Sequence, residues 1–303
     1  MQSEETAIGI DIGGTNVRAA LVLASGRILE KISERTVRDA PALLARLVEM
    51  VRQLDRADVA AIGIGVPGRV DARNGLVLSG GYVDLSAVPL MQAMQSRTGR
   101  RTFIDNDCNM ALVAETALGA ARGCRNVVML TIGTGIGGAV MLDGAVLRGR
   151  RSAGQLGHVT VDVGGIVCAC GRRGCLETVA SGTALARHIA EAGLADNTSV
   201  EMVFDLCRGG DARALHVLKA WAYPLRAALD SAVASFDPEL VVLGGGLGEA
   251  ACRALQWAPA LAPWYQCSVK PALLGDDAGV IGAALSGLSP PTRFDAEDQK
   301  QAS

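Results

Sequence analysis

Short apolar segments and one longer amphipathic segment make up the first part of the chain. Residues 7–11, 17–23 and 28–33 are aliphatic runs separated by glycine-containing turns, which predicts three strands. Residues 41–57 carry leucine and valine at helical spacing, and residues 59–66 form a continuously apolar run typical of a buried strand. The order of three strands, a helix and a strand predicts an α/β lobe.

A similar order returns further along the chain. Strands are expected at residues 126–132 and 139–142, on either side of a second glycine-rich turn, and this repetition indicates a weak internal duplication. Helices are then expected at residues 183–191, 200–208, 211–236, 249–255 and 279–285, with a buried strand at 240–243.

Composition limits the classes of protein that fit. The chain has 303 residues, of which 50% are hydrophobic and 20% are charged, enough for two lobes with an aliphatic core. The formal net charge of −2 gives no reason to expect nucleic acid or an acidic membrane as a partner. The chain shows no charged-then-apolar leader and no apolar run of about 18 residues, so we expect a cytoplasmic protein.

The densest chemistry lies in one glycine-rich stretch. His158 precedes Cys168, Cys170 and Cys175, and one imidazole with three thiolates is a complete tetrahedral set for Zn²⁺. Four protein ligands close such a site, so the metal would be structural. The alternative is a group of buried free cysteines beside a hydrogen-bonded histidine.

Two further stretches have the pattern of phosphate-binding hairpins. Asp11 ends the first strand before Gly13-Gly14-Thr15, where glycines admit an anion to the backbone N–H groups and the carboxylate can hold Mg²⁺ or its water. The same pattern can also make an ordinary hairpin. The second stretch, residues 133–138, follows a strand and does not open a helix, so it is not a dinucleotide fingerprint.

A strand expected at residues 102–104 runs into a polar corner before a helix expected at 110–120. Asn106, Asp107 and Asn109 at this corner could bind a hydroxyl group. The alternative is that Asp107 only caps the helix. Residues 244–246 are three glycines after a buried strand. They either let the backbone lie against a base or ribose, or form a crowded turn.

Together these motifs resemble the ROK family, which groups bacterial sugar kinases with sugar-responsive repressors. In chain order they read D-x-G-G-T, N-D-x-N, T-x-G-T-G-x-G-G, G-H…C-x-C…C and a late G-G-G, from Ile8 to about Leu288. The resemblance implies an α/β chain with the actin-like ATPase (ribonuclease H-like) fold, two lobes around a nucleotide cleft. The first phosphate strand begins at Ala7, which leaves no room for the repressors' N-terminal DNA-binding domain and favours the kinase branch.

The resemblance also implies a division into lobes. The N-terminal lobe is expected to span residues 1–120, with a helix at 279–288 packing back on it. The C-terminal lobe is expected to span 121–278 and to contain the zinc loop, 158–175, and the adenosine-side motif. A homodimer is the implied assembly, with a sugar and ATP as the small-molecule partners.

Residue roles follow from the same resemblance. Asp107 is expected to be the general base that accepts the proton of the phosphorylated hydroxyl. The implied sugar-binding positions are Asn106, Gln155, His158, Glu177, Gly68 and Gly81. The implied ATP positions are Asp11, Gly13, Gly14, Thr15, Thr134, Gly135, Gly137, Gly138, Gly244, Gly245 and Gly246. The implied metal ligands are His158, Cys168, Cys170 and Cys175, with ATP, catalytic Mg²⁺ and structural Zn²⁺ as cofactors.

The expected function is transfer of the γ-phosphate of ATP to a hydroxyl of a hexose or hexose derivative, in the class of glucose, allose, fructose or an N-acetylhexosamine. Two departures affect the sugar site. Gln155 stands where the family usually has Glu, and Gly81 stands where it usually has a sugar-binding Asn. The alternatives are a kinase for a non-standard sugar and a catalytically silent or weak sugar-sensing protein. The zinc loop and the N-D-x-N corner disfavour an actin-like or Hsp70-like ATPase.

Overall fold

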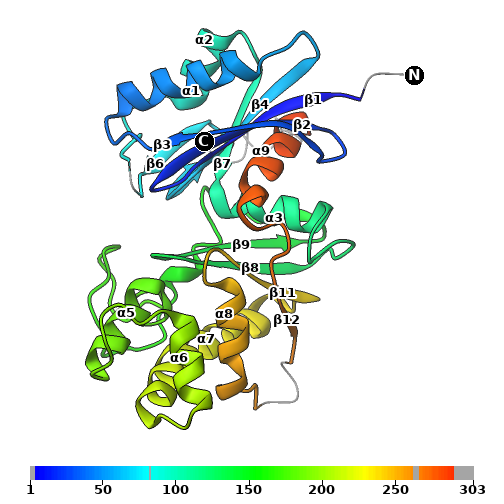
Figure 1. Cartoon of the computed structure of the whole chain (residues 1–303). Coiled ribbons are helices and arrows are strands. Elements are labelled where there is room, and N and C mark those ends of the chain that lie inside the picture. Colours follow the sequence, from blue (N-terminus) through cyan, green and yellow to red (C-terminus); the bar gives the residue numbers. More distant parts are fainter. Residues whose placement is uncertain (1–3, 82, 262–265, 290–303) are drawn as a thin grey trace, which may run out of the picture. The chain divides into compact units, whose positions relative to one another are not determined.

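The computed structural model describes residues 4–81, 83–261 and 266–289. The chain forms two compact units, which Figure 1 shows together with the labelled elements. Unit 1 contains residues 1–118, 148–153 and 276–303, and unit 2 contains residues 119–147 and 154–275. A short segment from the middle of the chain, 148–153, therefore belongs with the first unit, although the residues on both sides of it belong to the second.

Unit 1 is built on a five-stranded sheet with the order β3-β2-β1-β4-β7. Its strands are β1 (Thr6–Ile12), β2 (Asn16–Leu23), β3 (Ile28–Arg35), β4 (Val59–Val66) and β7 (Thr102–Asn106). The first three strands are antiparallel neighbours, whereas β4 and β7 run parallel to β1. The continuously apolar run is thus a central parallel strand, as its composition predicts.

Alternate residues of β1 lie on opposite faces of this sheet. Ile8, Ile10 and Ile12 are buried in one core with the apolar stripe of α1 (Ala40–Leu54) and with α2 (Leu90–Thr98). The intervening positions, Ala7, Gly9 and Asp11, are on the other face. Helix α1 starts at Ala40, because the Asp39 carboxylate caps it by accepting a hydrogen bond from Ala42 N.

The second face is covered by α9 (Ala278–Leu288) together with α3 (Asp107–Ala117). A Cβ atom at Gly9 would lie 1.8 Å from Val280 O, and one at Gly63 would lie 1.7 Å from Ala283 O. Glycine at both positions therefore lets the helix backbone rest directly on the sheet. In Figure 1, α9 lies against the strands of unit 1, although it is the last helix of the chain.

Unit 2 repeats this sheet plan with the order β10-β9-β8-β11-β12. Its strands are β8 (Val127–Ile132), β9 (Ile136–Leu142), β10 (Ala145–Val146), β11 (Leu240–Gly244) and β12 (Ser268–Pro271). The first three are again antiparallel, and β11 and β12 run parallel to β8. The internal duplication suggested by the two glycine-rich turns therefore extends to the strand order and direction of both sheets.

The helices of unit 2 share one large apolar core that includes the fully buried Trp221. They are α4 (Glu177–Ala180), α5 (Gly182–Glu191), α6 (Val200–Arg208), α7 (Ala212–Phe236) and α8 (Gly248–Ala254), with short 3-10 turns η1 (Leu156–His158) and η2 (Leu255–Trp257). In unit 1, β5 (Arg69–Asp71) and β6 (Leu76–Ser79) make a small hairpin. The 3-10 turn η4 (Gly275–Asp277), where the chain passes from unit 2 to unit 1, precedes α9.

Several short elements are not predicted from the sequence, among them α4, β10, β12 and the β5–β6 hairpin. The start of α3 is also wrong there: the helix begins at Asp107 and not at Met110. The side chain of Asn106 explains this difference, because it caps the helix from the strand's last residue. Among the described residues, no helix is both long enough and apolar enough to cross a membrane.

Candidate functional site

The corner between β7 and α3 is held by side chains of its own sequence. Asn106 Oδ1 accepts hydrogen bonds from Cys108 N at 2.9 Å and Asn109 N at 3.3 Å, so Asn106 is the helix cap. Its amide Nδ2 donates to Gly68 O at 2.9 Å and to Asp107 Oδ1 at 2.8 Å. Asn106 therefore fixes the Asp107 carboxylate. The helix cap is Asn106 and not Asp107, the alternative cap that the sequence allows.

Asp107 occupies an environment that suits a proton acceptor near neutral pH. Burial is the main reason that its pKa rises to about 7, and the nearby negative charge of Asp11 raises it further. Hydrogen bonds from Cys108 and Asn106 act in the opposite direction. A carboxylate poised at this pKa takes up a proton far more readily than an ordinary exposed aspartate.

Asp11 belongs to the same unit and ends the row of β1 residues that faces α9. Burial raises its pKa to about 6, although Arg18, whose guanidinium lies 3.7 Å from the carboxylate, lowers it. A Cβ atom at Gly279 would lie 2.7 Å from Asp11 Cγ, so the start of α9 borders this carboxylate. A largely buried carboxylate beside a hairpin is suited to hold Mg²⁺ or one of its waters.

The hairpin after Asp11 is short and its tip is open to solvent. Gly13 N donates to Asn16 O at 3.0 Å, and Gly14 and Thr15 are exposed. Thr36 closes the turn from β3, because its hydroxyl donates to Gly13 O and its N–H donates to Thr15 O. The tip can thus present backbone N–H groups to an anion.

Gly68 and Gly81 also lie in unit 1. Gly68 has a φ of +91°, and a side chain there would lie 2.3 Å from Ser79 O, so only glycine fits this position. Its carbonyl accepts the hydrogen bond from Asn106, which ties this turn to the corner. At Gly81 a Cβ atom would approach Pro67 Cβ at 3.3 Å, a contact that a small shift relieves.

In unit 2 the β8–β9 turn, residues 133–135, is held by the segment that follows the cysteines. Gly182 N donates to Gly133 O at 2.7 Å, and the hydroxyl of Thr183 donates to Thr134 O at 2.8 Å. Glu177 Oε2 accepts from Ile136 N at 2.9 Å, and a Cβ atom at Gly135 would lie only 2.4 Å from this oxygen. The absence of a side chain at Gly135 therefore makes room for Glu177.

The triple glycine at the end of β11 lies beside the same turn. Gly245 has a φ of +77°, and a Cβ atom there would lie 2.6 Å from Ile132 O. Leu247 N donates to Ile132 O, which fixes the turn against the end of β8. A side chain at Gly246 would meet open space, so this position leaves the backbone accessible. Gly244 is the last residue of the strand itself.

His158, Cys168, Cys170 and Cys175 converge within unit 2, with their ligand atoms all within 4.8 Å of one another. The Cys168 Sγ to His158 Nδ1 distance is 3.6 Å, and the Cys170 Sγ to Cys175 Sγ distance is 3.6 Å. A tetrahedral zinc ion with bonds of about 2.0–2.3 Å would hold its ligand atoms about 3.3–3.8 Å apart. The donor set and spacing therefore fit a four-coordinate metal.

Gln155 and Glu177 flank this cluster in the sequence. Gln155 precedes η1, which ends at His158 and packs tightly on β9, since a Cβ atom at Gly157 would lie 1.9 Å from Ile136 O. Glu177 begins α4, whose end is fixed where the indole Nε1 of Trp221 donates to Ala180 O at 2.7 Å. A buried indole needs such an acceptor, so the α7 core positions α4 and with it Glu177.

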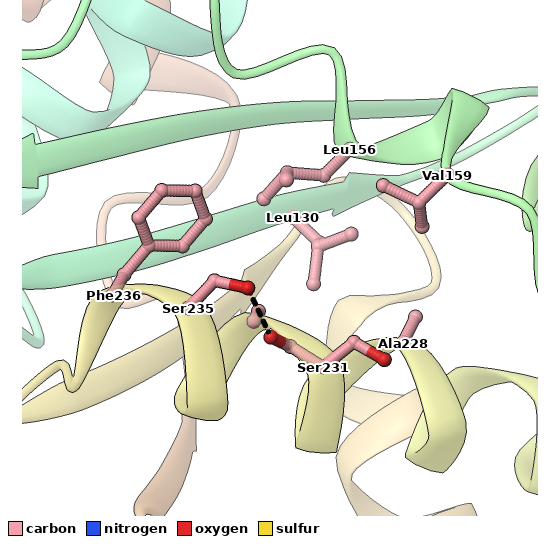
Figure 2. A pocket seen from close by; sticks show the side chains of 8 residues that line it. Leu130, Leu156, Val159, Ala228, Ser231, Ser235 and Phe236 are labelled. Carbon is pink, nitrogen blue, oxygen red and sulfur yellow. Dashed lines mark hydrogen bonds between the residues drawn. The ribbon is translucent and has the colours of Figure 1, made fainter.

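An apolar cavity of about 140 Å³ lies behind η1 in unit 2 (Figure 2). Leu156 and Val159, on either side of His158, line it together with α7 residues. The hydroxyls of Ser231 and Ser235 donate to carbonyls of their own helix. The cavity offers no titratable side chain, so it is a packing hollow and not a place for the expected chemistry.

The structure also reveals polar contacts that sequence reasoning missed. Asp105, one residue before Asn106, accepts hydrogen bonds from Arg148 Nε at 2.8 Å and from Asn109 Nδ2 at 2.9 Å. Asn109 is therefore buried, and its amide Nδ2 is bound to Asp105. Arg148 carries no local signal, because its partner lies 43 residues away.

Comparison with known proteins gives this arrangement a family. The sequence profile of the ROK family matches residues 7–286. The chain belongs to the ROK family. It is 36% identical to a glucokinase of Thermotoga maritima, over 91% of this chain and 95% of the relative. It is 35% identical to an N-acetylmannosamine kinase of Yersinia pseudotuberculosis, over 92% and 97% of the two chains.

Solved structures of ROK proteins agree with this assignment. A ROK family glucokinase from Streptomyces griseus, in complex with glucose and AMPPNP, superposes with a TM-score of 0.80 at 30% identity. The match covers 93% of this chain and 99% of that structure. The fold is accordingly the actin-like ATPase fold of ROK kinases, as the sequence motifs imply.

Proposed function

We propose that the protein is an ATP-dependent sugar kinase that phosphorylates a hydroxyl of a hexose or hexose derivative. The observation that carries this proposal is the Asn106–Asp107 corner, where a capped and hydrogen-bonded aspartate has its pKa raised to about 7. Relatives that share about a third of its residues are a glucokinase and an N-acetylmannosamine kinase, and both substrates belong to this class.

In the proposed reaction Asp107 accepts the proton of the acceptor hydroxyl while the hydroxyl oxygen attacks the γ-phosphorus of ATP. The bond from that phosphorus to the β,γ-bridging oxygen breaks, and ADP leaves. Most of the acceleration comes from positioning and charge neutralisation, as in phosphoryl transfer generally. Asn106 fixes the base, and a sugar hydroxyl that binds its amide would take the place of the Gly68 O acceptor.

The phosphates of ATP are assigned to two glycine-rich hairpins, at Gly13–Thr15 in unit 1 and, in unit 2, at Thr134–Gly138, which includes the turn and the first residues of β9. Their glycines admit the anion to backbone N–H groups. The adenosine is assigned to Gly244–Gly246, where Gly246 leaves the backbone open. Asp11 would hold Mg²⁺, which neutralises phosphate charge when bound.

The metal cluster supports a structural role for zinc. Three thiolates and one imidazole fill all four positions of a tetrahedral ion, so no position is left for a substrate. Zinc would fix the His158 ring through Nδ1, the nitrogen that faces Cys168, and leave Nε2 for a sugar hydroxyl. Glu177 and Gln155 follow as further sugar-contacting positions.

Two altered positions in the expected sugar site bear on which sugar is the substrate. Gln155 replaces a charged acceptor by a neutral one, and Gly81 removes an amide. The preferred sugar is therefore expected to differ from glucose at the hydroxyls that these two positions would contact. We further propose a homodimer, from the resemblance to the family, and a cytoplasmic location, since no disulfide joins the cysteines among the described residues.

A coupled assay of ADP formation over a panel of sugars tests the proposal. The panel contains glucose, allose, fructose, N-acetylmannosamine, N-acetylglucosamine and polyols, and the matched control is Asp107→Asn. We expect sugar-dependent ADP release by the wild type and its near loss in the control. Sugar binding without turnover on any member of the panel would instead identify a catalytically silent sugar sensor. Light scattering of the purified protein measures the dimer separately.

A further inference from the structure

We propose that Arg148 is a positioning residue for phosphoryl transfer, because it fixes the catalytic corner through Asp105 and anchors the segment that leads into Gln155 and His158. This inference rests on the proposed kinase function. It concerns residues for which the family motifs assign no role.

In the ion pair between Arg148 and Asp105, two guanidinium nitrogens converge on one carboxylate oxygen in a buried place. The guanidinium Nε and an Nη atom lie 2.8 Å and 2.7 Å from Asp105 Oδ2. The side chain of Asp105 is 3% exposed and that of Arg148 is 14% exposed. A charge pair this enclosed loses little to solvent screening, so both side chains are held in one geometry.

The other oxygen of Asp105 organises the corner. Asp105 Oδ1 accepts hydrogen bonds from Asn106 N at 2.7 Å and from Asn109 Nδ2 at 2.9 Å. Asn106 in turn caps α3 and holds the Asp107 carboxylate. A displacement of Asp105 would therefore be passed through one hydrogen bond to the residue that fixes the base. Positioning errors of about 1 Å can cost on the order of 100-fold in rate.

The segment 148–153 has two further anchors in unit 1. Arg151 Nε lies 3.6 Å from the buried Asp71 carboxylate, and Arg69 Nε donates to Ser152 Oγ at 3.1 Å. Ala153 N donates to Arg148 O at 2.9 Å, which closes the segment into a loop. Its two ends therefore lie side by side.

Gln155 follows this loop after one glycine, and η1 with the metal ligand His158 comes next. Arg148 thus sits at the base of the loop from which the expected sugar-contacting residues extend. Loss of the ion pair should act on the acceptor sugar and on the chemical step, and it should leave ATP binding largely unchanged.

The test uses four variants of the full chain. Arg148→Met removes the charge, and Arg148→Lys keeps it but offers one nitrogen in place of the two that contact Asp105 Oδ2. Asp105→Asn keeps the Oδ1 acceptor while losing the charged partner of Arg148. The matched control is Arg100→Met. Arg100 pairs with Asp55 at 2.9 Å in the same unit and donates to two carbonyls, away from the corner. Steady-state kinetics on the best sugar and thermal unfolding are measured for all four.

Arg148→Met is expected to lower kcat by about 10- to 100-fold and to raise KM for the sugar several-fold, while KM for ATP changes less than about twofold. The kcat and the KM for the sugar of Arg148→Lys should lie between those of Arg148→Met and those of the wild type. Arg100→Met should lower the Tm without changing the kinetic constants. If Arg148→Met does not fold, the test uses Arg148→Lys, for which kcat and KM for the sugar should again change while KM for ATP changes little.

Two outcomes overturn the proposal. In one, the Arg148 variants keep wild-type kinetic constants and lose only thermal stability, as the Arg100 control does. In the other, KM for ATP rises as much as KM for the sugar. Failure of the underlying kinase function is a separate result, because the wild type itself would then show no sugar-dependent ADP release.

Discussion

The carboxylate of Glu177 accepts a hydrogen bond from the backbone N–H of Ile136 at a distance of 2.9 Å. From the other side, Gly157 packs so closely on Ile136 O that a Cβ atom would lie 1.9 Å from it. Both ends of the cysteine-bearing segment therefore contact the first residue of β9. Within unit 2, the expected phosphate hairpin and the expected metal site are parts of one hydrogen-bonded assembly.

Replacing Glu177 should thus affect ATP as well as the sugar. Glu177→Ala removes the acceptor for Ile136 N–H, and a hydrogen bond to a charged group is worth about 1.5–3 kcal/mol. We expect KM for ATP to rise about tenfold or more, and Glu177→Gln, which keeps an acceptor oxygen, to show a smaller rise. Calorimetric titration with AMPPNP in the absence of sugar measures the corresponding change in nucleotide dissociation constant.

The matched control is Glu191→Gln, a change at an exposed carboxylate of the same unit that pairs with Arg187 and His188. It should leave the affinity for AMPPNP unchanged. A Glu177→Ala protein that binds AMPPNP like the wild type, and loses only sugar affinity, would show that the Ile136 contact does not position the hairpin.

Loss of a metal ligand, or of the metal itself, should lower the thermal stability of the protein. Cys170→Ser takes one thiolate from the cluster, and the free energy of metal binding is folding free energy for the segment that carries it. We expect about one zinc ion per wild-type chain by elemental analysis, less in the variant, and a lower Tm. Chelator treatment of the wild type should lower its Tm in the same way, and it should leave the Cys170→Ser Tm nearly unchanged. A well-folded wild type without bound metal would contradict this.

The raised pKa of Asp107 predicts opposite trends for activity and stability. An aspartate in the unfolded chain ionises near pH 4, with a pKa of about 3.9, whereas the native protein keeps Asp107 protonated up to about pH 7. Between these values the native state binds more protons than the unfolded state. The contribution of Asp107 to the free energy of unfolding is therefore present at low pH and falls as pH rises through this window.

Asp107→Asn should consequently raise the Tm more at pH 8 than at pH 5 in the absence of Mg²⁺ and nucleotide. Turnover requires the ionised base, so kcat/KM should rise with pH to a plateau above about pH 7. The variant should lose about 10²- to 10⁴-fold in kcat while AMPPNP affinity changes little. Near-normal turnover by Asp107→Asn would place the base elsewhere.

Sequence patterns predict those elements whose own residues decide them. The apolar run of β4 and the amphipathic stretch of α6 have the bounds expected from the sequence, residues 59–66 and 200–208. The start of α3 could not be read from hydrophobicity, because a single side-chain amide at Asn106 sets it. The edge strand β12 has a half-exposed pattern, so it lacks the apolar run that marks buried strands.

For the site as well, the sequence predicts only those features that residues close together in the chain determine. Glycine and cysteine motifs mark the hairpins and the metal cluster because their chemistry lies within short segments. Asp11 and Asp107 could be named from the sequence, but their raised pKa values could not. Those values depend on burial within unit 1, which for Asp11 includes the approach of Gly279 on α9, far away in the chain.

The altered sugar positions give a final prediction. A hydrogen bond to a charged acceptor is worth about 1.5–3 kcal/mol and one to a neutral acceptor about 0.5–1.5 kcal/mol. Gln155→Glu combined with Gly81→Asn should therefore lower KM for glucose several-fold to tenfold relative to the best sugar of the panel. A Cβ atom at Gly81 would meet Pro67 Cβ at 3.3 Å, a contact that a small shift relieves. An unchanged ratio of the two sugars would mean that these positions do not select the substrate.

The close packing of α9 on Gly9 and Gly63 bears on how the protein is made. β1 and β4 are synthesised first and α9 only after all of unit 2, so the part of the first sheet that α9 covers stays exposed during synthesis. Unit 2, whose residues 119–147 and 154–275 precede α9, can complete its own sheet during that time. Although domains generally fold in the order of their synthesis, here the unit that begins the chain is the last to be finished.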